Sequence, residues 1–113
     1  MDNEGRTAYA KLAQLDRVIH EPARLAIMAV LYGCAAADFE FLLRMTGLTK
    51  GNLSAHASRL EEAGFVRVEK GFEGKRPYTR YALTPDGRRA FAAYRELLGT
   101  TLVAVGNDPE STG

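Results

Sequence analysis

The stretch TKGNLSAHASRLEEAG, residues 49–64, combines residue types that can bind nucleic acid. On a helix, Leu53, Ala57 and Leu60 fall on one side. The opposite side carries the small residues Gly51, Ala55 and Ser58, which would let the helix axis approach a surface closely, together with Asn52, Arg59 and Glu62. Asparagine can pair with adenine, and arginine with guanine, through two hydrogen bonds in a major groove. On these residues alone, a groove-binding helix and an ordinary surface helix both stay open. The outward and phosphate-facing candidates are Thr49, Lys50, Asn52, Ala55, Ser58 and Arg59.

The residues before this stretch predict a helix-turn-helix. DFEFLLRMTG, residues 38–47, reads as a helix that Asp38 caps and Gly47 ends. Thr49 is a cap for the next helix, at 49–63, and Gly64 stops it. Because only Gly47 and Leu48 separate the two helices, they form a motif that places its second helix in the major groove.

The residues after this stretch predict a basic β-hairpin. Two alternating runs, FVRVEK and YTRYAL, are joined by the glycine-rich loop GFEGKRP, residues 71–77. Lys75 and Arg76 at its tip could reach the DNA backbone or a neighbouring minor groove. We expect Phe72 in this loop to pack under the hairpin. A helix-turn-helix followed by such a hairpin is a winged helix.

Three further helices complete the predicted fold. The first covers about residues 8–19, the second runs from Pro22 to about Tyr32 and is apolar nearly all round, and the last begins after a Thr84 cap and runs to about Val103. We therefore predict a mainly α fold with a small β-hairpin wing, a winged helix-turn-helix with extra N- and C-terminal helices. It forms a single domain over residues 8–105, between flexible tails at 1–7 and 106–113.

Composition and charge fit one globular domain with a basic middle. The 113 residues are 46% hydrophobic and 26% charged. Residues 44–81 hold eight basic and four acidic residues, a balance of +4, whereas the flanks balance to −3. This asymmetry suits a phosphate-binding surface, although an ordinary solvated surface would also explain it. No apolar run is long enough to span a bilayer, no secretory signal is present, and the lone Cys34 suits a reducing cytoplasm.

Enzymatic and metal sites find little support in the sequence. Cys34 and His56 lack an orienting third group, and the chain offers neither a nucleophile elbow nor paired carboxylates. The GK of GFEGKRP lacks the spacing and the Ser/Thr of a P-loop. Only Cys34, His20 and His56 could supply soft or imidazole metal ligands, and they lie far apart. We expect no enzyme activity, no cofactor and no metal, and we expect His20 to be a hydrogen-bonding residue at a helix junction.

Two long segments resemble the winged-helix regulators of the MarR/ArsR type. They are LDRVIHEPARLAIMAVL and DFEFLLRMTGLTKGNLSAHASRLEEAGFVRVEKGFEGKRPYTRYALTPDGRRAF. The chain is most similar to a short stand-alone family with the signature LTxGNLSxH and LEEAGxVxVEKxFxGxRPxTxYxLTxxGR, over about residues 15–98. The resemblance implies a dimeric transcription factor that binds a pseudo-palindromic operator. It also implies groove-facing positions at Lys50, Asn52, Ser54, His56 and Arg59 and wing positions at Lys75, Arg76 and Arg80.

Dimerisation is expected because one helix-turn-helix buries too little DNA surface for strong specificity. The first and last helices carry apolar stripes that could form the interface or could pack within their own domain. The candidates are Tyr9, Leu12, Leu15, Phe91, Tyr94, Leu98 and Leu102. A small apolar effector between these helices is permitted by the resemblance, but no residue demands it. The sequence-based prediction is thus a cytoplasmic DNA-binding homodimer that acts as a repressor, and the alternative is a winged helix that only docks proteins.

Overall fold

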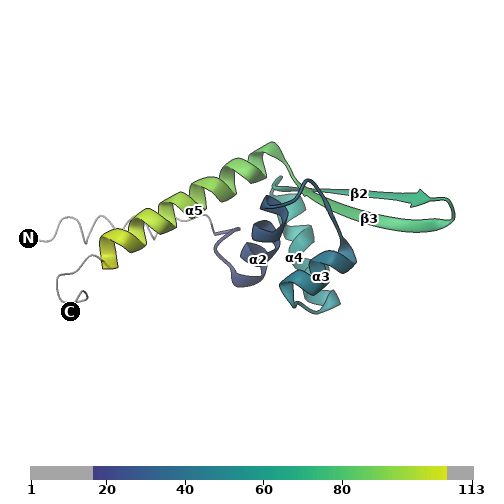
Figure 1. Ribbon diagram of the computed structural model, residues 1–113, viewed down its shortest axis with the longest axis horizontal. Helices are drawn as coiled ribbons and strands as arrows, with labels where there is room; N and C mark the ends of the chain where they lie inside the picture. The colour runs from purple at the N-terminus through teal and green to yellow at the C-terminus, as the bar shows by residue number, and fades with distance from the viewer. Residues whose placement is uncertain (1–16, 107–113) are drawn as a thin grey trace, which may run out of the picture.

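The helices and strands follow the order predicted for a winged helix, with one additional short strand. The computed structural model describes residues 17–106, and its elements are α2 (Pro22–Tyr32), β1 (Ala37–Asp38), α3 (Phe39–Thr46), α4 (Lys50–Glu62), β2 (Val66–Glu73), β3 (Arg76–Leu83) and α5 (Pro85–Gly106). Figure 1 shows α5 and the β2–β3 hairpin extending to opposite sides of the group formed by α2, α3 and α4. The predicted winged helix-turn-helix is therefore confirmed.

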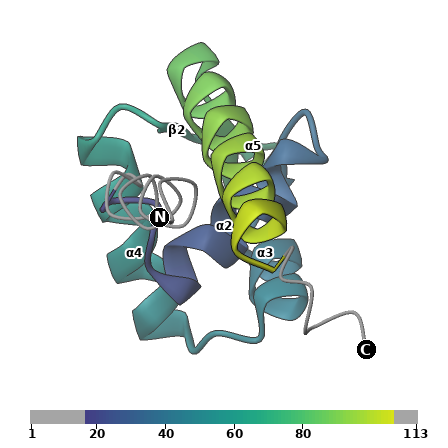
Figure 2. The same cartoon turned by 90° about the vertical axis from the view of Figure 1, so that its left-hand side faces the viewer.

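Helix α2 is the centre of the core. It lies between α3 and α4 and beside α5 (Figure 2). Its Ile27, Met28 and Leu31 side chains are fully buried, as its nearly all-round apolar sequence predicts. Burial of each side chain of this size contributes about 1.5–3 kcal/mol. The fully buried partners from the neighbouring helices are Leu42, Leu53 and Leu60.

The helix-turn-helix has the caps that the sequence predicts. The Asp38 carboxylate accepts the Phe41 N–H at 2.7 Å at the start of α3. Gly47 ends α3 with φ of +70°, a conformation that costs glycine little. The Thr49 hydroxyl then accepts the Asn52 N–H at 3.2 Å and starts α4. These local signals fix where the two helices begin and where α3 ends.

The hairpin is longer, and its turn shorter, than predicted. The register pairs Phe72 with Pro77 and Glu73 with Arg76, so most of the expected loop 71–77 lies in the strands. Only Gly74 and Lys75 form the turn, with Gly74 at φ of +65°, where a type II′ turn takes glycine. The loop prediction was wrong because glycine and proline usually mark loops, and this segment contains both. Pro77 is tolerated because it lies beyond the end of β1, where this edge of β3 is unpaired.

Two other predicted segments differ. Strand β1, which pairs with Tyr81 and Arg80 of β3, was not predicted, because two residues are too few for an alternating pattern. The first predicted helix, 8–19, and the predicted tails fall wholly or mainly outside the described residues. Residues 17–19, its described end, form a turn instead of helix. In this turn the Glu21 N–H donates a hydrogen bond to the Ile19 carbonyl, and Glu21 is the N-cap of α2.

Candidate nucleic-acid interface

Helix α4 presents one buried and one polar exposed side. Leu53, Ala57 and Leu60 are buried against α2 and the rest of the core. The predicted DNA-contacting residues on the other sides of the helix are exposed: Thr49, Lys50, Asn52, Ser54, Ala55, Ser58 and Arg59. No hydrogen bond or ion pair within residues 17–106 holds the side chain of Asn52 or Arg59. Both side chains are thus available to a ligand, and their contact with DNA stays a prediction.

The first turn of α4 is suited to an anion. The Thr49 hydroxyl is occupied by the Asn52 N–H, which leaves the backbone N–H groups of Lys50 and Gly51 without a partner inside the helix. Gly51 is exposed, and no atom lies within 4 Å of the position that a Cβ would take there. Backbone donors and the Lys50 charge at a helix N-terminus form a favourable place for a phosphate.

His56 differs from the other predicted groove-facing residues. Its side chain is 23% exposed and faces α2, where its Nδ1 lies 3.2 Å from Nη1 of Arg24 and its Nε2 lies 3.9 Å from the Glu21 carboxylate. Arg24 also donates from Nε to the Val18 carbonyl. This placement gives no support to the groove-facing role expected of His56. It belongs to a link between α4 and the start of α2, which sequence reasoning missed because Arg24 and His56 are 32 residues apart.

This link predicts a pH effect on stability. The pKa of Glu21 lies below its usual value, chiefly because its carboxylate accepts the Arg24 backbone N–H, with His56 and Arg24 adding attraction. A lowered folded-state pKa gives stability above the unfolded value of about 4.3, and this stability is lost as pH falls through the folded value. Glu21→Gln keeps the hydrogen-bond acceptor without the charge. Urea unfolding between pH 6 and 3 should therefore show a shallower loss of stability than in wild type.

The matched control for this prediction is Glu96→Gln, which removes the same charge from the exposed side of α5. The control should follow the wild-type pH profile. An equally steep profile for Glu21→Gln would mean that the carboxylate charge contributes nothing to the link.

One face of the hairpin continues the surface of α4. Val68 and Tyr81 are paired across the ladder and, with Lys70, border a hollow against Ser54, Ala57, Ser58 and Glu61 of α4. Because side chains alternate along a strand, the next pairs on this face, which we call the α4-side face, are Lys70–Thr79 and Phe72–Pro77. Lys70 is exposed beside the polar surface of α4. It is a candidate phosphate contact that the sequence analysis did not name, although its spacing of two from Val68 indicates the shared face.

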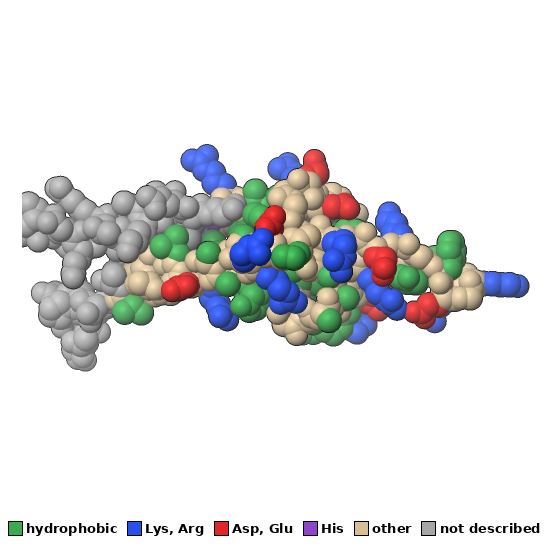
Figure 3. All heavy atoms as spheres, turned by 90° about the horizontal axis from the view of Figure 1, so that it is seen from above, with side chains coloured by type: hydrophobic (Ala, Val, Ile, Leu, Met, Phe, Trp, Pro, Cys, Tyr) green, Lys and Arg blue, Asp and Glu red, His purple; other side chains and the backbone are tan. Residues whose placement is uncertain are grey.

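On the other face of the hairpin, charged side chains contact each other and a tyrosine ring. Arg80 donates to the Glu73 carboxylate at 2.6 Å, and its guanidinium lies 4.3 Å from the centre of the Tyr78 ring. The Tyr78 ring covers Gly71, where a Cβ would lie 2.6 Å from the phenolic oxygen. In the view of Figure 3, basic and acidic side chains alternate along the hairpin and a basic group projects at its end. Arg80 is thus already paired and on the face opposite α4, so its expected role as a wing contact receives no support from its placement.

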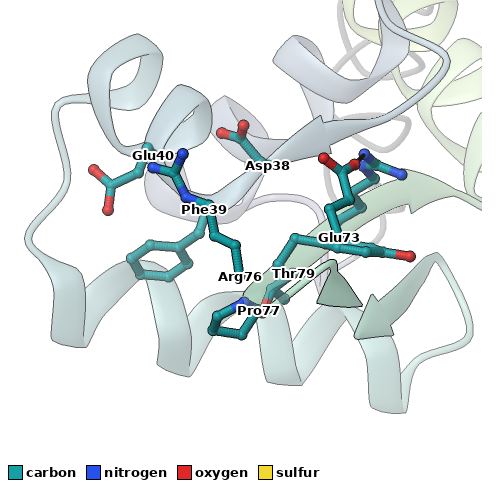
Figure 4. Close-up of a pocket in the computed structure, with 9 residues that line it drawn as sticks. Asp38, Phe39, Glu40, Glu73, Arg76, Pro77 and Thr79 are labelled. Atoms are coloured by element: carbon teal, nitrogen blue, oxygen red, sulfur yellow. Dashed lines mark hydrogen bonds and ion pairs between the residues drawn. The ribbon is translucent and has the colours of Figure 1, made fainter. Parts of the chain in front are cut away.

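A second hollow separates the hairpin from the start of α3. Figure 4 shows Asp38, Phe39 and Glu40 of β1 and α3 on one side of it and Arg76, Pro77 and Thr79 of β3 on the other. Arg76 is exposed, pairs across the ladder with Glu73 and shares this hollow with acidic residues. Its positive charge is therefore partly offset locally. Lys75, in the turn, has no ion-pair partner within residues 17–106 and is the less screened of the two tip residues.

The exposure of the Phe72 side chain contradicts the packing predicted for it. The side chain is 72% exposed, because the hairpin extends past the helices that cover its base (Figure 1). The expectation that Phe72 packs under the hairpin was therefore wrong. An alternating pattern identifies a strand face but does not show where the covering helices end.

The predicted dimer-interface residues separate into two groups. Tyr9, Leu12 and Leu15 lie outside the described residues. Phe91 and Tyr94 are buried in the chain's own core, and the Tyr94 hydroxyl lies 2.8 Å from Nδ1 of His20, which confirms the hydrogen-bonding role expected for that histidine. This packing leaves Phe91 and Tyr94 little surface for a partner. The remaining candidates are Leu98, which is half-buried, and Leu102, which is 53% exposed next to Val103 at 70%.

Neither a metal cluster nor a membrane-spanning helix occurs in the described part of the chain. Within residues 17–106, no group of three or more His, Cys, Asp and Glu side chains is placed to hold a metal ion. None of the helices in that range combines the length and apolar character needed to cross a membrane.

Comparison with known proteins agrees with this geometry. A family model described as "Winged helix DNA-binding domain" matches residues 23–102. An uncharacterized protein of Methanocaldococcus jannaschii is 37% identical over 78 residues, which cover 69% of this chain and 85% of that protein.

Solved structures show the same fold. A transcriptional regulator homologue from Pyrococcus horikoshii OT3 superposes with a TM-score of 0.77 at 27% identity, over 82% of this chain and 94% of its own. A MarR-family regulator from Enterococcus faecalis V583 has a TM-score of 0.67 at 24% identity, over 88% and 86% of the two chains. The protein belongs to the winged helix DNA-binding domain family and has the fold of MarR-type transcriptional regulators.

Proposed function

We propose that the chain is a sequence-specific regulator that binds double-stranded DNA through α4. The observation that carries this proposal is the exposed side of α4. It combines small residues, Gly51, Ala55 and Ser58, with the side chains of Asn52 and Arg59, which have no hydrogen-bond or ion-pair partner within residues 17–106. A helix with short side chains at its centre can enter a major groove closely, and the two longer polar side chains can then reach base edges.

The wing and the start of α4 would position this helix. Backbone N–H groups and Lys50 at the start of α4 bind one phosphate, and Lys70 on the α4-side face of the hairpin binds another. The turn at Gly74–Lys75 then reaches the neighbouring minor groove. Phosphate contacts fix the register of the helix and leave the reading of sequence to Asn52 and Arg59.

The regulator acts as a homodimer on a pseudo-palindromic operator. A single recognition helix reads few base pairs, and a two-fold dimer doubles the contacts. The exposed Leu102 and Val103 side chains near the end of α5 support an association surface there. Repression follows if the bound dimer blocks access to its operator.

Selection of a random duplex library on the purified protein, followed by sequencing, tests this function. Enrichment of an inverted repeat with half-sites about one helical turn apart would establish a dimeric, sequence-specific regulator. Retention without sequence enrichment would contradict base reading and leave only a phosphate-binding surface. Retention of no DNA at all would favour the alternative of a winged helix that docks proteins.

Lys75→Ala tests the position of the wing. If Lys75 binds a phosphate, its removal should weaken binding evenly across sequences. The slope of log affinity against log salt should fall by about 0.9 for each phosphate that the protein no longer neutralises, and so by about twice that in a dimer. Binding is measured by fluorescence anisotropy at salt concentrations on the order of 50–300 mM, where this dependence is steep. Arg89→Ala, which removes an exposed charge from α5, should keep the wild-type slope; an unchanged slope for Lys75→Ala would place the turn away from DNA.

A further inference from the structure

The exposed Phe72 side chain has no structural role within the described part of the chain. Among the large hydrophobic side chains whose exposure is described, those of residues 17–103, it is the most exposed, at 72%. Across the ladder it is paired with Pro77, which is also exposed, so the two form a small apolar patch near the end of the hairpin. A single exposed apolar residue is common, but an aromatic and a proline side by side on one face of the hairpin call for an explanation.

The surroundings of this patch are basic on the side that faces α4. Lys70 precedes Phe72 by two residues on the α4-side face, and Lys75 lies in the adjoining turn. The acidic residues of the hairpin, Glu69 and Glu73, lie on the opposite face by the same alternation, and Glu73 is paired with Arg80. Neither Lys70 nor Lys75 has an ion-pair partner within residues 17–106, and an apolar patch between two such cations complements a surface in which phosphates flank stacked bases.

On the opposite face of the hairpin, side-chain contacts hold the two strands together next to Phe72. Tyr78 lies over Gly71, the residue next to Phe72, and the Arg80 guanidinium lies over the Tyr78 ring. These contacts join the two strands on the far side of the hairpin. A hairpin braced in this way can hold Phe72 in a fixed direction when it meets a ligand.

We propose that Phe72, supported by Pro77, is an apolar wedge that enters the minor groove of DNA and partly unstacks one base step. Apolar side chains at this kind of position kink the duplex and select for base steps that unstack easily. Lys70 and Lys75 bind the phosphates on either side of the wedge. The inference rests on the proposed DNA-binding function and adds a specificity-determining residue outside α4.

The test uses three proteins on the operator recovered by library selection: wild type, Phe72→Ala and Phe72→Leu. Since Phe72 is exposed, neither substitution should disturb folding, which circular dichroism checks. Phe72→Ala should weaken binding about tenfold with an unchanged salt slope, because every phosphate stays neutralised. This pattern is the converse of that expected for Lys75→Ala. Phe72→Leu, which keeps an apolar wedge, should retain most of the affinity.

Two measurements detect base unstacking and DNA bending, the direct effects of a wedge. A 2-aminopurine placed in the flanking minor-groove steps should brighten when wild type unstacks it, and energy transfer between labelled duplex ends should report a bend. Both signals should disappear with Phe72→Ala and persist with Phe72→Leu. Equal affinity, bend and fluorescence for wild type and Phe72→Ala would overturn the wedge alone. A wild-type protein that binds no duplex would overturn the proposed function and the wedge together, and altered self-association of Phe72→Ala would assign the patch to a protein contact instead.

Discussion

Replacement of Gly87 by alanine is expected to lower the free energy of unfolding by about 3 kcal/mol, the upper part of the usual range for an overpacked position. Gly87 lies in the first turn of α5 and is buried against the backbone of Phe65. An added Cβ would come within 2.0 Å of the Phe65 carbonyl oxygen and 2.9 Å of its carbonyl carbon. Because these atoms belong to the backbone, no side-chain rotation relieves the clash, and α5 must move away from the segment between α4 and β2.

That movement would also break hydrogen bonds around the start of α5. The Thr84 hydroxyl accepts the Gly87 N–H at 3.0 Å and donates to the Gly64 carbonyl at 2.6 Å, while the Thr84 N–H donates to the Phe65 carbonyl. These bonds attach the cap of α5 to the end of α4. Displacement of Gly87 therefore strains the junction that connects α4, the hairpin and α5.

Gly99→Ala is the matched control on the same helix. Gly99 is exposed, and no atom lies within 4 Å of its Cβ position, so alanine there should raise stability by about 0.5–1 kcal/mol through helix propensity. Thermal unfolding at one fixed protein concentration should show the two variants moving in opposite directions, with a decrease on the order of 10–20 °C for Gly87→Ala. A wild-type melting temperature for Gly87→Ala would mean that α5 does not pack this closely on Phe65.

Signals confined to a few neighbouring residues predicted most of the fold. Asp38, Gly47 and Thr49 define the helix-turn-helix because each acts on backbone groups within three or four residues of itself. The buried and exposed sides of α4 follow from helical periodicity in the same way. For this reason the exposed side of α4, with Asn52 and Arg59, could be outlined from sequence.

The contacts between distant segments could not be predicted in this way. Arg24 meets His56 across 32 positions, and the two-residue strand β1 exists only because β3 lies beside it. The hairpin shows a related failure, since glycine and proline usually mark loops but here lie in paired strands. Gly71 is required by the Tyr78 ring above it rather than by a turn. In each case the residue that determines the structure lies on another helix or strand. The sequence pattern of neighbouring residues carries no information about such a partner.

Arg59→Ala is expected to cost about 1–3 kcal/mol of operator binding and to relax base preference at one position of each half-site. The side chain is exposed in the last turns of α4, and no ion pair within residues 17–106 neutralises it. A planar guanidinium can donate two hydrogen bonds to the N7 and O6 acceptors of guanine. The loss of affinity should therefore be large on the preferred operator and small on an operator in which that guanine pair is replaced.

Arg59→Lys separates base reading from simple charge. Lysine keeps the positive charge but not the rigid fork, so it should restore the salt slope while leaving base preference weakened. The measurement is a cycle of wild type, Arg59→Ala and Arg59→Lys on the selected operator and on its substituted form, with Arg89→Ala as the charge control. If the two operators respond equally to Arg59→Ala, and lysine restores full affinity to both, Arg59 contacts phosphate. Sequence reading by α4 would then rest on Asn52, whose amide can also make two hydrogen bonds to one base and has no partner within residues 17–106.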